Sequence, residues 1–180
     1  MAAATPQVVV RQYEAIVEGF GLLPRWVVLS TLAALGLLPN AGEGRGPAGL
    51  KAGPPGVLVA KYSPPWFTTA ILQGGQLRLF RTVGLAAGED SLVSPESVLE
   101  ALYPSVAYFQ DNFAGVLEKA CLCGLGENSP AIVEMLGHEL KLEVIPSLGG
   151  GGFEVRGLNP FHQERHFAAL LGVVRGYCDG

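Results

Sequence analysis

Residues 57–82, VLVAKYSPPWFTTAILQGGQLRLFRT, decide the fold. They contain three β-prone stretches, at Val57–Lys61, Thr68–Leu72 and Gln76–Thr82. The Gly74-Gly75 pair between the second and third stretches is typical of a tight β-hairpin turn. The block therefore predicts two or three antiparallel strands, with Ser63–Phe67 as an exposed loop between the first two.

Helical and strand-like segments alternate on both sides of this block. They are a helix over 7–20, a strand over 26–30, a helix from Ser30 or Thr31 to Leu38, a helix opening at Ser94-Pro95-Glu96 with Pro104 as a candidate break, a strand over 118–123, a helix to about Leu140, a strand over 142–145 and a helix over 160–176. This order predicts an α/β fold with a mixed sheet. Residues 39–56, rich in Gly and Pro, are expected to form a flexible loop.

The composition excludes several classes of protein. The chain has 180 residues, of which 49% are hydrophobic and 16% charged, so it can bury a core and is not disordered. The net charge of −4 argues against a nucleic-acid partner, because phosphates need a basic face. The longest uncharged stretch, residues 26–42, is broken by polar residues, Gly and Pro, so no membrane span is expected. The low charge fraction indicates either a large core or an apolar surface that meets a partner.

Two segments are candidates for binding an anion. The loop Gly124-Leu125-Gly126-Glu127-Asn128-Ser129 lies between a strand and a helix, where backbone N–H groups receive phosphates. The alternative is a tight turn with a helix cap, and Glu127 would repel a phosphate. Thr68 and Thr69 begin a strand and have hydroxyls for phosphate oxygens, although threonine is also common in strands.

Other residues favour binding or packing over catalysis. Trp66 and Phe67 follow two prolines and are candidates to anchor a protein partner, or else they fold back over the sheet. Cys121 and Cys123 alternate on a strand and are expected to be core thiols. His162 and His166 lack the spacing of a zinc motif, so no metal site and no catalytic set is expected.

Several segments together resemble the second half of the actin-like ATPase superfamily, and within it the PilM family of type IV pilus assembly proteins. The likeness rests on Ala2–Pro6, Tyr13–Leu22, Ser30–Leu35, Thr68–Leu72, Gly75–Thr82, Ser105–Phe113, Cys121–Gly126 and Leu170–Gly176. It implies a ribonuclease-H-like lobe over residues 1–180, in which a three-strand antiparallel meander joins parallel strands. Thr68 and Thr69 would then belong to the second phosphate loop, and Gly124 and Gly126 to the adenosine motif.

The departures from the family pattern bear on activity. In the family an Asp-Ile-Gly strand end begins the phosphate loop, whereas this chain has Val59-Ala-Lys-Tyr-Ser63. The carboxylate that would organise Mg²⁺ is missing. The first half of the fold is absent too, so the chain is expected to be either a truncated form or a short relative. ATP and Mg²⁺ would bind only together with that first lobe.

The resemblance therefore implies a scaffold that is non-catalytic or binds nucleotide weakly. It would bind other proteins of a type IV pilus or type II secretion-like assembly, in the cytoplasm at the inner membrane, and form a homodimer through an uncovered apolar face. Two alternatives stay open. One is the second half of a functional ATP-binding actin-like ATPase. The other is an unrelated α/β domain that binds a small molecule.

Overall fold

The structure is a computed structural model that describes residues 6–24, 28–35, 54–86, 88, 92–125, 129–145, 169–170 and 173. Its centre is a five-stranded sheet in the order β3-β2-β1-β4-β5. The strands are β1 (Gly56–Ser63), β2 (Trp66–Gln73), β3 (Gln76–Gly84), β4 (Leu117–Cys123) and β5 (Glu143–Ile145). Strands β1, β2 and β3 pair antiparallel, whereas β4 pairs parallel to β1 and to β5. The expected mixed sheet, a three-strand meander joined to parallel strands, is confirmed.

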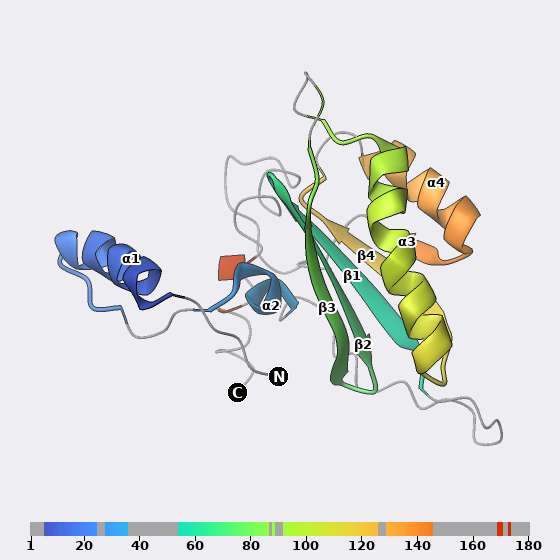
Figure 1. The fold of residues 1–180 in the computed structure, drawn as a ribbon, viewed down its shortest axis with the longest axis horizontal. Coiled ribbons are helices and arrows are strands. Elements are labelled where there is room, and N and C mark those ends of the chain that lie inside the picture. Colours follow the sequence, from blue (N-terminus) through green and yellow to red (C-terminus); the bar gives the residue numbers. More distant parts are fainter. Residues whose placement is uncertain are drawn as a thin grey trace.

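Helices lie against both faces of this sheet (Figure 1). The longer ones, α3 (Pro95–Asn112) and α4 (Ser129–Leu140), cover one face and bury the larger core. That core includes Phe67, Ile71 and Phe109. On the other face Ala34 of α2 (Ser30–Ala34) packs with Val59, Ala70, Cys121 and Cys123. None of the described helices is long and apolar enough to cross a bilayer.

The two hairpins of the meander differ in how well the sequence predicts them. Gly74 and Gly75 have φ angles of +56° and +72°, as a tight turn of the primed type requires, and this turn is confirmed. The loop expected over Ser63–Phe67 is wrong. Only Pro64 and Pro65, joined by a cis peptide bond, form the turn, and pairing extends to Ser63 and Trp66. Because Phe67 is buried in the core, strand β2 extends as far as the hairpin turn.

Helix α3 begins as expected and continues past its proline. The Ser94 hydroxyl accepts a hydrogen bond from the Ser97 N–H at 3.2 Å, and Pro95 occupies the first turn. The candidate break at Pro104 does not occur. Pro104 has no N–H with which to bond the carbonyl of Glu100, four residues earlier in the helix. Both residues are exposed, so water can pair with that carbonyl. On the opposite side the buried side chains of Val98, Leu102, Val106 and Phe109 hold the helix to the sheet.

Several other expectations change or fall outside the described residues. Val28 and Leu29 are not in a strand, and α2 begins at Ser30 with no side-chain cap. Gly56 belongs to β1, so the loop expected over 39–56 ends earlier, and its residues 39–53 are not among those described. The helix expected over 160–176 is described only at residues 169–170 and 173, which are helical.

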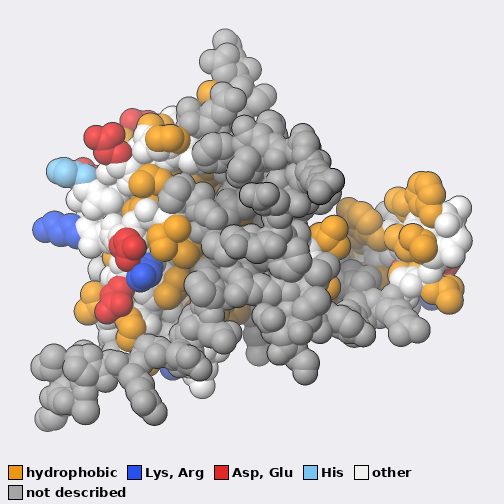
Figure 2. All heavy atoms as spheres, turned by 180° about the vertical axis from the view of Figure 1, so that it is seen from behind, with side chains coloured by type: hydrophobic (Ala, Val, Ile, Leu, Met, Phe, Trp, Pro, Cys, Tyr) orange, Lys and Arg blue, Asp and Glu red, His pale blue; other side chains and the backbone are white. Residues whose placement is uncertain are grey.

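Helix α1 (Gln7–Gly19) is amphipathic as expected, yet it has no buried residue. In Figure 1 it lies apart from the sheet and its two covering layers. Val8, Tyr13, Ile16 and Phe20 are between 60% and 81% exposed. Figure 2 shows hydrophobic side chains gathered on this helix. The apolar surface that the low charge fraction allowed for is thus found, in part, on α1.

Candidate functional site

The two threonines expected to bind a phosphate together lie on opposite faces of the sheet. Successive side chains of a strand alternate, so Thr69 shares the α3–α4 face with Phe67 and Ile71. Thr68 shares the other face with Ala70. The Thr68 hydroxyl is 3.0 Å from the hydroxyl of Thr82 on the neighbouring strand β3. Only Thr68, and not the Thr68–Thr69 pair, can therefore contribute to a site on that face.

Thr68 belongs to a polar row that crosses four strands. In the sheet register Lys61 lies opposite Thr68 on one side and opposite Cys123 on the other, and Thr68 lies opposite Thr82. We call Cys123, Lys61, Thr68 and Thr82 the Lys61 row. Register partners project from the same face of a sheet, so these four side chains are neighbours. The Lys61 ammonium donates a hydrogen bond to the hydroxyl of Ser63, two residues nearer the hairpin turn.

Lys61 is the unusual member of this row because it is a buried cation. It is only 5% exposed. Burial lowers its pKa from the ordinary value of 10.5, and the neighbouring Cys123 opposes that shift. The salt bridges among the described residues, Lys119–Glu143 and His138–Glu139, do not involve it. Within the described part of the chain no carboxylate forms a salt bridge with this ammonium, and the Cys123 thiol lies beside it. A buried ammonium favours an anionic partner.

The sequence contains a signal for Lys61 that does not depend on the resemblance to a family. Between Lys51 and Arg78 it is the only charged residue of the chain. A lone charge in a strand whose neighbours are apolar is placed against the hydrophobic pattern, and such placements are found at functional or strained sites. This signal identifies the residue, but not the hydroxyls that surround it.

Gly124 follows β4 and has a structural reason to be glycine. Its φ angle is +82°, and a Cβ atom there would lie closer than 3.0 Å to the carbonyl oxygen of Tyr62 on β1. This close approach accounts for Gly124 with no ligand involved. Gly126, the second glycine of the candidate loop, lies outside the described residues, as do Glu127 and Asn128.

The two aromatic residues proposed as a partner anchor also separate. Trp66 is 56% exposed at the first position of β2 and is available for contact. Phe67 is fully buried against α3 and α4, so the expectation that it contacts a partner is wrong. The physical reason is strand alternation, which sends adjacent side chains to opposite faces.

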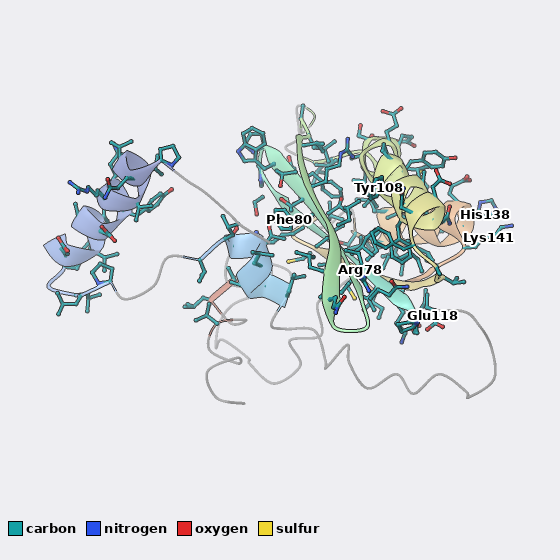
Figure 3. The ribbon with its side chains drawn as sticks, turned by 60° about the horizontal axis from the view of Figure 1, so that its bottom comes forward. Arg78, Phe80, Tyr108, Glu118, His138 and Lys141 are labelled. Atoms are coloured by element: carbon teal, nitrogen blue, oxygen red, sulfur yellow. The ribbon has the colours of Figure 1, made fainter. Side chains whose placement is uncertain are left out.

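The residues at this end of the sheet do not fit a magnesium ion. Mg²⁺ needs carboxylate or other oxygen ligands, and a buried ammonium repels it. Over the described ranges no group of three or more His, Cys, Asp or Glu residues could hold a metal ion. His138 and Lys141 lie at the far end of α4, away from Phe80 on β3 (Figure 3). His162 and His166 are outside the described residues.

The mixed sheet and its flanking helices define an α/β lobe of the actin-like ATPase fold class. The fold is similar to that of a chain in the solved structure of the PilM-PilN type IV pilus biogenesis complex. That match has a TM-score of 0.63 and 19% identity, and covers 94% of this chain and 58% of that one. A Bacteroides thetaiotaomicron protein with an actin-like ATPase fold and unknown function matches at a TM-score of 0.40, with 16% identity over 66% of this chain and 38% of its own. No family model and no curated protein sequence matches.

The likeness to the PilM-PilN chain confirms the fold expected from the sequence. At 19% identity it shows the fold alone. The present chain spans about 58% of the length of that protein chain.

Proposed function

We propose that the chain is a non-catalytic scaffold component of a type IV pilus or type II secretion-like assembly. In this role it binds other assembly proteins at the cytoplasmic face of the inner membrane. The observation that carries the proposal is the fold match to a chain of the PilM-PilN complex over 94% of this chain. That complex joins two pilus biogenesis proteins by its own description, which supports protein binding as the role of the shared fold.

The chemistry at the end of β1 supports the non-catalytic part of the proposal. Hydrolysis of ATP by this superfamily depends on a carboxylate that organises Mg²⁺, and the chain has Lys61 in the corresponding stretch. A buried lysine raises the electrostatic cost of a metal ion there. ATP and Mg²⁺ remain part of the alternative in which a further lobe completes the site.

Trp66 is the contact that we propose for an assembly partner. Its ring is more than half exposed beside the Pro64–Pro65 turn, and an exposed tryptophan at a hairpin turn suits a binding hot spot. Self-association through α1 belongs to the same proposal. The polar side of α1 has Arg11, Glu14 and Glu18, so its net charge is negative. A negative charge does not favour a membrane of anionic lipid as the surface that covers the apolar side of the helix.

Co-purification tests the scaffold role. The tagged chain is co-expressed with the pilus-assembly proteins encoded in the same genome, and complexes are measured by size-exclusion chromatography and calorimetry. We expect a complex that Trp66→Ala weakens and that Tyr103→Ala, on the exposed side of α3, leaves unchanged. No complex with any of these proteins would contradict the scaffold role. Magnesium-dependent ATP hydrolysis by the chain would support the ATPase alternative instead.

A further inference from the structure

The outer strand β3 has an edge to which a further strand can pair. In the sheet order β3-β2-β1-β4-β5 it is the first strand, and within the described part of the chain it pairs with β2 alone (Figure 1). It is also the longest of the five described strands, and it contains no proline. Proteins commonly protect such an edge with a short strand, a proline or charged side chains, because unpaired backbone groups invite pairing with another chain.

The register identifies which backbone groups of β3 face away from β2. The Leu85 N–H donates to the Pro65 carbonyl at 2.8 Å, so the backbone groups of Leu85 point toward β2. In an antiparallel pair this direction alternates from one residue to the next, and the pairing is regular over residues 79–84. The groups that face outward are therefore the N–H and C=O of Phe80, Thr82 and Gly84.

The two arginines of β3 lie against α3 and do not cover this edge. The register with β2 passes over Arg78, so a β-bulge interrupts the pairing near the hairpin turn, before residues 79–84. The guanidinium carbon of Arg78 lies 5.7 Å from the centre of the Phe113 ring, at the end of α3. The Arg81 guanidinium donates to the carbonyl of Ala101 in α3 at 2.9 Å. Figure 3 shows Arg78 on β3, beside this layer.

The charges of the meander indicate the kind of strand that fits this edge. Residues 56–84 contain three cations, Lys61, Arg78 and Arg81, and no aspartate or glutamate, although the chain has a net charge of −4. None of the salt bridges among the described residues involves either arginine. Opposite charges on adjacent strands stabilise the pairing, whereas like charges oppose it. An acidic strand is therefore complementary to β3, and a second copy, which brings its own arginines, is not.

The other face of β3 has room for an apolar side chain. Trp66 lies opposite Gly84 in the register, and its side chain is 56% exposed. Thr82 and Gly84 are exposed as well, and a Cβ atom added at Gly84 would meet nothing within 4 Å. A side chain placed opposite Gly84 on an added strand can therefore pass over the glycine toward the Trp66 ring.

We propose that β3 accepts an extended acidic segment of a partner protein as an additional strand, paired along residues 79–84. The backbone of this segment bonds to the outward groups of Phe80, Thr82 and Gly84. Its carboxylates face Arg81, and its apolar side chains lie on the side of Trp66. In strand addition the backbone bonds supply affinity and the alternate side chains supply specificity. The inference rests on the proposed scaffold role, because it specifies how an assembly partner binds beside Trp66.

Amide hydrogen exchange, measured by NMR on the isotope-labelled chain, tests the free edge. In the chain alone we expect the amides of Phe80, Thr82 and Gly84 to exchange at least about tenfold faster than those of the residues between them, which bond to β2. Equal protection of both sets would overturn the proposal, because the edge would already be paired. Protection that rises with protein concentration would assign a second copy, and constant protection would assign another part of this chain.

A short capped peptide that alternates valine and glutamate is the probe for strand addition. We expect saturable binding by fluorescence anisotropy, with slower exchange of the three outward amides. The same peptide N-methylated throughout, which has no backbone donors, should bind at least about tenfold more weakly. A peptide that alternates valine and lysine should bind several-fold more weakly, because its charges face Arg81.

Variants of β3 locate the binding edge. Thr82→Pro removes an outward N–H and no bond to β2, which an edge strand tolerates, so it should weaken peptide binding at least about tenfold. Thr82→Val keeps the N–H and is the matched control, with an affinity within about twofold of the parent. If Thr82→Pro does not fold by circular dichroism, the N-methylated peptide decides. The proposal is overturned if the valine–glutamate peptide does not bind saturably, or if either the N-methylated peptide or folded Thr82→Pro binds as tightly as its parent.

The failure of strand addition and that of the scaffold role give different results. A complex with an assembly protein in which the three outward amides still exchange fast would overturn strand addition and keep the scaffold role. Peptide binding at β3 without any such complex would contradict the scaffold role and support β3 as a binding edge.

Discussion

Substituting Gly124 by alanine tests the close approach between the end of β4 and strand β1. Two separate costs arise at this position. An L-residue at a φ of +82° costs about 1–2 kcal/mol relative to glycine. The added Cβ would also lie closer than 3.0 Å to the Tyr62 carbonyl oxygen, a backbone atom of the central strand β1. Displacing such an atom costs about 1–3 kcal/mol.

The two costs add to a loss of about 2–5 kcal/mol in the free energy of unfolding. That is a large share of the roughly 5–15 kcal/mol that stabilises an ordinary domain. Urea denaturation followed by far-ultraviolet circular dichroism measures the loss. We expect the midpoint of Gly124→Ala to fall well below that of the parent, with little change in the slope.

Alanine substitutions at two other glycines, Gly75 and Gly84, separate the cost of the positive φ angle from the cost of the steric contact. Gly75 has a φ of +72°, but a Cβ atom added there would meet nothing within 4 Å, so Gly75→Ala should lose only the strain, about 1–2 kcal/mol. Gly84 has open space and no positive φ, so Gly84→Ala should change stability by less than about 0.5 kcal/mol. Gly124→Ala as stable as Gly84→Ala would refute the reasoning. Gly124→Ala equal to Gly75→Ala would refute the steric part.

Three further predictions concern the hairpin, the buried lysine and α1. Phe67→Ala should destabilise the protein by about 3–5 kcal/mol in urea because it empties a fully buried site, whereas Trp66→Ala should cost under about 1 kcal/mol; equal losses would contradict the assigned faces. Lys61→Met should raise stability at pH 7 in phosphate-free buffer by about 1 kcal/mol. Because burial lowers the pKa of Lys61, the unfolded chain loses this proton at a higher pH than the folded one. The stability of the parent should therefore rise as the pH approaches 10.5, and the advantage of Lys61→Met should shrink. A difference in urea midpoints that stays constant with pH would count against a buried charge. Ile16→Glu with Phe20→Glu should shift sedimentation from a dimer to a monomer, and a parent that is monomeric at high concentration would rule out self-association through α1.

The parts of the fold that local chemistry determines could be predicted from the sequence. Gly74-Gly75 specifies a turn by its backbone freedom, and Ser94-Pro95 specifies a helix start, whatever the rest of the chain does. The Pro64–Pro65 turn could not be predicted in the same way. Two prolines remove backbone donors and indicate a loop, yet burial of Phe67 extends both strands to the turn.

The candidate site could be predicted only in part because it depends on which face each side chain takes. Adjacent threonines look like one feature in a sequence, but the pleat of β2 sends Thr68 and Thr69 to opposite sides. The partner of Thr68 is Lys61, seven residues away in sequence and opposite it in register. The register of the hairpin brings these two residues together.

The sign of the charge at the end of β1 determines whether an actin-like lobe can hold a metal ion there. A carboxylate there recognises a phosphate indirectly, through Mg²⁺, and the metal also supports hydrolysis. A lysine can contact a phosphate oxygen directly and excludes the metal, so recognition of the anion and hydrolysis become separable. The Lys61 ammonium donates a hydrogen bond to the Ser63 hydroxyl, and none of the salt bridges among the described residues involves it. A lysine in place of that carboxylate is therefore compatible with the proposed scaffold, whose exposed contact residue Trp66 lies on the adjoining hairpin.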